Sequence, residues 1–129
     1  MIVVDASVLI ELLLQTTAAP AISHRIFASG ESLCAPHLLD VEVAQVLRRY
    51  VRAKTMTSAR AEQAIQYLAD LPLRRYPHKA LLPRIWQLRN NFTAYDAAYL
   101  ALAEALDAPL LTRDRALASP CSRARVELI

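Results

Sequence analysis

Four acidic residues, spread over most of the chain, stand at the edges of expected secondary-structure elements. Asp5 and Asp114 each follow a short apolar run, and Glu42 and Asp96 lie early in helical segments. In an α/β protein, the carboxyl ends of parallel strands and the beginnings of the following helices meet along one rim. Two carboxylates about 5 Å apart repel by about 3 kcal/mol at an effective dielectric constant of about 20. Such a cluster is sustained by protonation or by a divalent cation, so the pattern predicts a metal-ion site.

The available residue types favour a hard cation over zinc. Mg²⁺ and Mn²⁺ prefer carboxylate oxygens, whereas zinc sites are commonly built from clustered cysteine and histidine. The two cysteines, Cys34 and Cys121, lack the spacing of a zinc motif or of a disulfide framework. The three histidines, His24, His37 and His78, stand apart in the sequence. The acids therefore predict a site for Mg²⁺ or Mn²⁺.

Helix capping offers a second explanation for three of the four acids. Thr93 is a good N-cap with Asp96 at the third helical position, which resembles a capping box and complements the helix dipole. Asp5 and Asp114 are each placed to cap the helical segment that follows. A carboxylate at the end of a buried strand nevertheless needs donors or a cation, and Asp5 occupies such a place. The capping and metal-binding roles are compatible in one side chain.

Glu42 borders the apolar stripe of its helix, where a glutamate is commonly solvated. Asp40, two residues earlier, is an alternative functional acid. By helical angle, Glu42 lies nearer to the core-facing side, so we prefer it. The stripe itself consists of Leu39, Val43, Val46, Leu47 and Tyr50.

Short apolar runs alternate with helical segments, which indicates an α/β fold with a mainly parallel sheet. Gly30 is expected to end the second helix, and Pro36 is expected to stop the second strand. Residues 54–77 have the pattern of a helical protrusion rather than of a second domain. Strands are expected at residues 1–5, 32–35, 73–76, 110–112 and 126–129. Helices are expected at residues 6–14, 20–29, 37–53, 58–70, 79–89, 93–106 and 113–118.

Composition bounds the class of protein. The length of 129 residues predicts one domain, 1–129, and an apolar content of 55% argues against disorder. The single glycine, Gly30, leaves no glycine-rich phosphate loop. Residues 1–14 lack the basic start of a signal peptide, and no apolar stretch reaches the roughly 18 residues of a membrane span. We therefore expect a cytoplasmic protein without a membrane segment.

The formal net charge is +3, from 15 basic and 12 acidic residues. Most of the basic residues are arginine, which suits bidentate contacts with phosphate. Arg113 and Arg115 flank Asp114 and are candidates for binding the phosphates of RNA, with solvated surface charge as the alternative. A basic helical patch with the same two interpretations consists of Arg48, Arg49 and Arg52.

Four segments, taken in order, resemble the PIN-domain nucleases, and most closely the VapC toxins of toxin–antitoxin pairs. The resemblance spans nearly the whole chain, and the last two segments at their separation are its most specific part. The segments are Val3–Ser7, Leu39–Leu47, Thr93–Ala103 and Leu111–Asp114.

The resemblance implies a PIN-like three-layer sandwich, in which helices cover both faces of the sheet and the acids lie at its carboxyl edge. It implies an Mg²⁺- or Mn²⁺-dependent endoribonuclease that hydrolyses RNA phosphodiester bonds. Ser7 and Thr112 match positions whose small hydroxyl groups support the site. A homodimer and a cognate VapB-like antitoxin, whose tail inserts at or near the active site, are also implied. The catalytic and metal-binding set implied by the motifs is Asp5, Glu42, Asp96 and Asp114.

Other classes of protein also gather acids at a sheet edge. A phosphatase of the haloacid-dehalogenase type needs a second aspartate where this chain has Ser7. A receiver domain needs paired acids after its first strand and a late lysine, but the last lysine here is Lys79. A housekeeping PIN-type nuclease and a non-catalytic binding module of the same fold remain open. A neighbouring short gene for a DNA-binding antitoxin would distinguish a toxin from a housekeeping enzyme.

Overall fold

Five short parallel strands form the centre of the structure, a computed structural model that describes residues 1–28 and 30–129. They lie in the order β3-β2-β1-β4-β5, and each of the four pairings is parallel. The central strands are fully buried, which accounts for their near-continuous apolar sequences. The strands are β1 (Ile2–Val4), β2 (Leu33–Pro36), β3 (Leu73–Tyr76), β4 (Leu110–Thr112) and β5 (Val126–Leu128).

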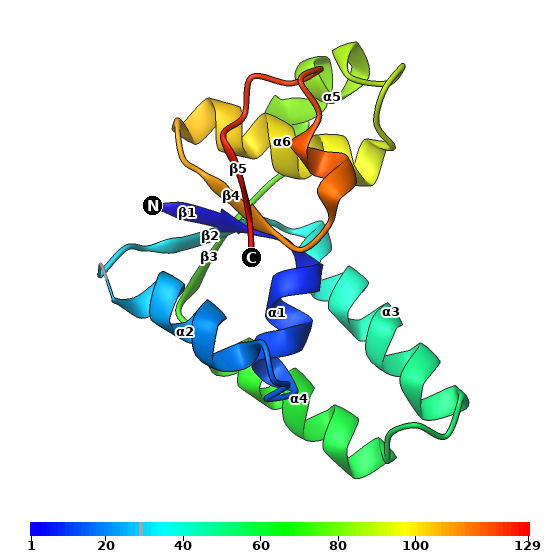
Figure 1. The fold of residues 1–129 in the computed structure, drawn as a ribbon. Coiled ribbons are helices and arrows are strands. Elements are labelled where there is room, and N and C mark those ends of the chain that lie inside the picture. The colour runs from blue at the N-terminus through cyan, green and yellow to red at the C-terminus, as the bar shows by residue number, and fades with distance from the viewer. Residues whose placement is uncertain (29) are drawn as a thin grey trace.

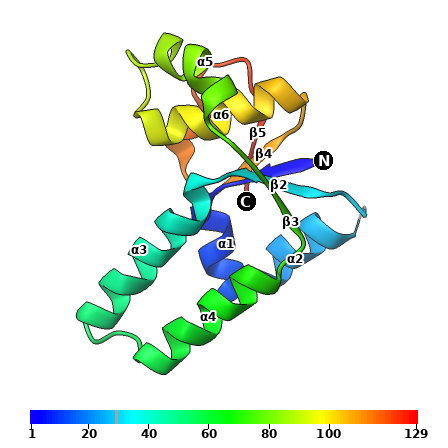
Figure 2. The same cartoon turned by 180° about the vertical axis from the view of Figure 1, so that it is seen from behind.

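Helices cover both faces of this sheet, which confirms the predicted three-layer α/β sandwich (Figure 1). On one side, α6 (Ala94–Leu106) packs across β1, β2 and β4, with α5 (Leu82–Gln87) outside it. The view from behind shows the remaining helices on the opposite side (Figure 2). These are α1 (Ala6–Leu13), α2 (Ala19–Phe27), α3 (Leu38–Arg52) and α4 (Ser58–Asp70).

Several helices begin at residues whose chemistry favours a helix start. The carboxylate of Asp5 accepts a hydrogen bond from the Val8 amide at the start of α1. Thr57 caps α4 and Thr93 caps α6 in the same way, each through its hydroxyl oxygen. Pro20 lies in the first turn of α2, where its missing N–H group costs no hydrogen bond. None of the helices in the described residues is long and apolar enough to cross a bilayer.

Two expected boundaries were wrong, one because of strand pairing and one because of a helix cap. Pro36 is the last residue of β2 and does not stop the strand before it. It pairs with Tyr76 on β3, whereas β1 pairs no further along β2 than Cys34, so the missing N–H group of the proline breaks no ladder on that side. The last short helix is a 3₁₀ turn, η2 (Arg115–Ala118), which begins two residues late because Asp114 caps it.

The expected helix at residues 79–89 is instead two short pieces. A 3₁₀ turn, η1 (Lys79–Leu81), precedes α5, which ends at Gln87. Pro83 lies in the first turn of α5, where proline starts a helix but cannot continue one from an earlier turn. Gly30 has the left-handed backbone (φ 65°) expected near a helix end, while the expected end of α2 at residue 29 lies outside the described residues.

The helices α3 and α4 form a hairpin that projects away from the sheet (Figures 1 and 2). The predicted protrusion at residues 54–77 is therefore half of this hairpin, and its last residues return to the sheet as β3. A bidentate ion pair between Arg75 on β3 and Asp40 on α3, at 2.7 and 2.9 Å, ties the base of the hairpin to the sheet edge.

Candidate active site

The pairing of β1 with β4 brings two of the predicted acids to one edge of the sheet. Val4 pairs with Leu111, so the next residue after β1, Asp5, lies beside Thr112 at the end of β4. Asp114 follows two residues later. Glu42 comes from the second turn of α3, which begins directly after β2, and Asp96 comes from the first turn of α6. All four acids thus lie at the carboxyl side of the sheet.

Asp5 is the most buried of the four acids, with an exposed fraction of 6%. One carboxylate oxygen accepts hydrogen bonds from the Ser7 hydroxyl (2.6 Å) and the Val8 amide (3.2 Å), and the other accepts one from the Thr112 hydroxyl. Burial raises the pKa of Asp5, and these hydrogen bonds oppose that rise without cancelling it. The carboxylate is therefore held in one orientation but lacks a positive partner in the described part of the chain.

Two hydroxyl groups join the turn after β1 to the turn after β4. Thr112 donates to Asp5 and accepts a hydrogen bond from the Asp114 amide at 3.0 Å. Ser7 also donates to Asp5 and accepts one from the Arg113 amide at 3.0 Å. Both residues that were predicted to support the site contact Asp5 directly, and they position the backbone that carries Asp114.

Glu42 is half-buried and accepts a hydrogen bond of 2.6 Å from the Tyr99 hydroxyl. Burial raises the pKa of Glu42, and the charges of Asp5 and Asp96 raise it further, while the bond from Tyr99 lowers it. Burial, followed by the bond to Glu42, raises the pKa of Tyr99 well above its usual range, so the phenol stays protonated and donates. The alternative acid, Asp40, is engaged with Arg75 instead.

Tyr99 is a site residue for which the sequence analysis predicted no role. It lies three residues after Asp96, so both side chains project from the same face of α6. That spacing was the available signal. Tyrosine in a buried apolar helix is common in cores, however, and only the tertiary structure shows that its hydroxyl reaches Glu42 on α3, at the edge of the sheet.

Asp114 caps a helical turn with its carboxylate, and Asp96 lies in the first turn of a helix that Thr93 caps. The Asp96 amide donates to the capping hydroxyl of Thr93 at 3.2 Å, and Asp114 caps η2 by accepting from the Ala116 amide at 2.9 Å. Burial raises the pKa of Asp96, and the charges of Asp114 and Asp5 add to that rise. The capping interpretation is confirmed for Asp114. At the start of α6, Thr93 is the cap, and within the described residues no hydrogen bond from the Thr93 amide to the Asp96 carboxylate completes the predicted capping box.

The four acids form one electrostatic site. The charges of Asp5 and Asp96 raise the pKa of Glu42, and the charges of Asp114 and Asp5 raise the pKa of Asp96. Among the described residues, however, no three acidic, histidine or cysteine side chains lie close enough together to enclose a metal ion. The donor set still fits Mg²⁺ or Mn²⁺, because such ions commonly take one or two carboxylates and fill the other positions with water and substrate oxygens.

The two arginines beside Asp114 differ in their contacts. Arg113 donates to the Ile129 carbonyl at 3.0 Å and lies 3.6 Å from a carboxylate oxygen of Glu11. Arg115 is exposed and has no ion pair within residues 1–28 and 30–129. Both are near enough in sequence to Asp114 to approach a substrate bound there.

The histidines lie outside the acidic site. His78 accepts a hydrogen bond from the Leu38 amide at 3.0 Å and so caps α3 from another element. The His37 ring lies edge-on to it, with ring centres 6.0 Å apart. His24 lies in the last turn of α2. Although the histidines stand apart in sequence, the fold therefore brings two of them together, in a structural role.

Comparison with known proteins identifies relatives over almost the whole chain. Residues 2–121 match the PIN domain family. The chain is 43% identical to ribonuclease VapC9 of Mycobacterium tuberculosis over 114 residues, which cover 88% of this chain and 86% of that protein. It is 40% identical to ribonuclease VapC12 of the same species over 130 residues, covering 100% and 99%. VapBC2 from Rickettsia felis, solved bound to a promoter DNA fragment, shares the fold with a TM-score of 0.71 at 12% identity, covering 98% of each chain.

Proposed function

This chain belongs to the PIN domain family and, within it, to the VapC ribonucleases, and from that premise we propose that it is the toxin of a toxin–antitoxin pair. Its reaction is the hydrolysis of RNA phosphodiester bonds, supported by Mg²⁺ or Mn²⁺. The observation that supports this proposal best is the gathering of four acids at the carboxyl edge of the sheet, where Ser7 and Thr112 orient Asp5 and Tyr99 orients Glu42.

In this proposal, Asp5, Glu42, Asp96 and Asp114 hold the divalent ion and its water ligands. The chemistry that a bound ion supplies is positive charge beside the phosphate and a lowered pKa of a bound water. Ser7 and Thr112 orient Asp5 through their hydroxyl groups, and Tyr99 orients Glu42. Burial and mutual repulsion make the ionised forms of these acids unfavourable in the folded protein. A bound cation would offset this unfavourable free energy.

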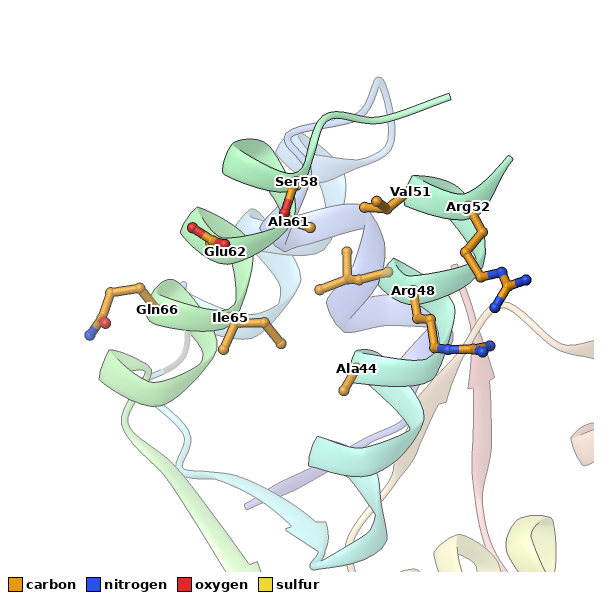
Figure 3. Close-up of a pocket in the computed structure, with 10 residues that line it drawn as sticks. Ala44, Arg48, Val51, Arg52, Ser58, Ala61, Glu62, Ile65 and Gln66 are labelled. Carbon is orange, nitrogen blue, oxygen red and sulfur yellow. The ribbon is translucent and has the colours of Figure 1, made fainter. Parts of the chain in front are cut away.

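One segment of the cognate antitoxin is expected to dock on the projecting hairpin, apart from the tail that the resemblance implies inserts at or near the active site. A cavity of about 680 Å³ lies between α3 and α4, away from the acids, and its wall includes Leu47, Ala61 and Ile65 (Figure 3). Arg48 and Arg52 stand at one side of it and have no ion pair in the part of the chain that the structure describes. An amphipathic antitoxin segment with acidic residues beside its apolar face fits this surface.

The remaining expectations follow from the family. We propose a homodimer as the functional assembly, the cytoplasm as the compartment, and residues 1–129 as a single catalytic domain. A housekeeping nuclease would share the acidic site. The apolar hairpin surface favours the toxin, because Val41 and Ile65 expose 72% and 41% of their surface, as expected of residues that await a protein partner.

The first test is cleavage of RNA by purified protein freed of antitoxin. Structured and unstructured RNA would be incubated with Mn²⁺, Mg²⁺ or EDTA, with an Asp96→Asn variant beside the wild type. Asparagine has nearly the size of aspartate but no charge, and the cap between the Thr93 hydroxyl and the backbone amide of residue 96 is kept, so the variant tests the metal role alone. We expect metal-dependent cleavage by the wild type and a loss of at least about 100-fold in the variant.

Thermal unfolding of the same two proteins provides an independent readout. The pKa of Asp96 is raised in the folded state, so its ionised form destabilises the fold increasingly as pH rises through that value. At neutral pH in EDTA, Asp96→Asn should therefore unfold at a temperature equal to or a few degrees above that of the wild type. Addition of Mg²⁺ or Mn²⁺ should raise the unfolding temperature of the wild type more than that of Asp96→Asn. Equal cleavage by both proteins would reject the site, and an equal effect of metal on both would reject the metal role of Asp96.

A further inference from the structure

A smaller cavity lies next to the acidic site. It is on the side of α3 that faces α1, opposite the cavity between α3 and α4. It has a volume of about 320 Å³, at the small end of the range of ligand pockets. Its walls come from α1, from α3 and from the turn after β4, three elements that meet beside Asp5. Ser7, whose hydroxyl donates to Asp5, is one of its lining residues. The cavity is therefore separated from the buried carboxylate by a single side chain.

Two arginines from different elements line this cavity. Arg49 comes from α3 and Arg113 from the turn after β4. Glu11 on α1 lies 3.6 Å from Arg113, and the Ile129 carbonyl accepts a hydrogen bond from the same side chain, so Arg113 is held in place. Arg49 makes no ion pair with any residue in the described ranges. With two cations and one carboxylate, the cavity carries net positive charge next to an acidic centre.

The apolar part of the wall suits a base or sugar rather than a bare ion. Ile10 and Val46 contribute aliphatic surface, and Tyr50 contributes an aromatic ring with an exposed fraction of 37%. Exposed aromatic rings beside arginines are the usual platform for nucleotides of single-stranded RNA. An acidic peptide would form ion pairs with the arginines but would not need an aromatic ring to stack on.

The expected basic patch on α3 is thus divided between two surfaces. Arg48 and Arg52 line the cavity toward α4, where Figure 3 shows their side chains. Arg49 alone of the three lines the cavity beside Ser7. One helix therefore presents arginine to two separate surfaces, and only one of these adjoins the acids.

We propose that the cavity formed by Ser7, Glu11, Arg49, Tyr50 and Arg113 holds the RNA nucleotide next to the cleaved bond. Arg49 and Arg113 bind its phosphate, and Tyr50 packs against its base or ribose. This inference rests on the proposed ribonuclease function and adds a substrate subsite to it. Arg49 and Tyr50 are binding residues here, and they take no part in the chemical step.

The test compares Arg49→Gln with Arg48→Gln, its neighbour on the other surface of the helix. Glutamine retains helix propensity, so both variants should fold like the wild type, as thermal unfolding would show. A labelled single-stranded RNA carrying a sequence that the wild type cleaves would be titrated against each variant in the Asp96→Asn background, which leaves the RNA intact. Arg49→Gln should bind the RNA roughly three- to tenfold more weakly than the protein that keeps Arg49. The slope of log K against log salt concentration should also be smaller in magnitude by about 0.7. Arg48→Gln should change neither the affinity nor this slope.

A neutral methylphosphonate placed next to the cleaved bond locates the contact. It should weaken binding to protein that keeps Arg49, and should have little further effect on Arg49→Gln. In the cleavage assay, Arg49→Gln should raise KM while kcat changes little. Tyr50→Leu should behave similarly, and Tyr50→Phe should restore binding.

The outcomes separate this inference from the ribonuclease assignment. If the wild type cleaves RNA but Arg49→Gln and Tyr50→Leu bind and cleave like it, the subsite is wrong while the enzyme stands. If these variants lose only the antitoxin, the cavity belongs to the protein partner and the inference is overturned. If the wild type neither cleaves nor binds RNA, both proposals fail.

Discussion

At the scale of single residues, the site is built from acids whose charged forms the fold disfavours. Burial is the largest cause of the raised pKa of Asp5, Glu42 and Asp96, and repulsion among the acids contributes to two of them. Hydrogen bonds from Ser7, Thr112 and Tyr99 oppose these shifts. The balance leaves carboxylates that are oriented but poorly compensated, which is how a protein prepares a site for a cation.

Removing the Tyr99 hydroxyl should shift the pH dependence of cleavage. The bond from Tyr99 lowers the pKa of Glu42, so Tyr99→Phe should raise that pKa further and move the acid limb of the pH–rate profile to higher pH. At neutral pH, we expect a loss of roughly tenfold in kcat/KM, equivalent to about 1.4 kcal/mol. Tyr95→Phe on the exposed side of α6 is the matched control. An unchanged acid limb in Tyr99→Phe would show that Glu42 does not control it.

At the scale of elements, two hydroxyl groups decide whether separate turns make one site. Thr112 is completely buried and links Asp5 to the backbone of Asp114. Ser7 makes the equivalent link to the Arg113 amide. The strand pairing of β1 with β4 brings the turns together, and these hydrogen bonds set the orientation of the acids that they carry.

Loss of the Thr112 hydroxyl should reduce both stability and activity. Thr112→Val keeps the shape of the side chain but leaves an oxygen of Asp5 and the Asp114 amide without that partner. A destabilisation of about 1–3 kcal/mol is expected, measurable by denaturant unfolding, together with a fall in cleavage. Thr112→Ser keeps the hydroxyl and should retain most of both. Equal stability of all three proteins would show that the link contributes little.

At the scale of the whole molecule, two cavities lie on opposite sides of α3, and we propose a different partner for each. The cavity toward α4 is apolar and remote from the acids, whereas the small cavity toward α1 adjoins them. Antitoxin binding and RNA binding should therefore respond to different substitutions. This separation arises from the packing of α3 between α1 and α4.

A charge in the hairpin cavity should prevent antitoxin binding without affecting the enzyme. Ile65→Glu places a carboxylate in the apolar wall and should weaken binding to the product of the adjacent short gene by more than about tenfold. Tyr67→Glu, on an exposed part of α4 that does not line the cavity between α3 and α4, is the control. Both variants should cleave RNA like the wild type. Full antitoxin binding by Ile65→Glu would place the partner elsewhere.

Much of the fold was predictable because local signals agree with the tertiary structure. The buried strand runs and the caps at Asp5, Thr57 and Thr93 act over a few residues, so their effect is visible in the sequence. The boundaries that failed involve competition between local choices and distant partners. Pro36 can belong to β2 because β1 pairs with β2 only as far as Cys34. The residues next to the proline in the sequence do not reveal where that pairing ends.

The sequence by itself determined the α/β class, the order of the elements and the four acids at their edges, because periodicity, capping and strand ends are local properties. Only the tertiary structure decided which side chains meet. It assigned Asp40 to Arg75, brought Tyr99 to Glu42, and divided the arginines of α3 between two cavities. These outcomes depend on where α3 lies relative to α1, α4, α6 and β3. A side chain's partners across such contacts follow from the three-dimensional positions of several elements at once, and spacing along one helix does not determine them.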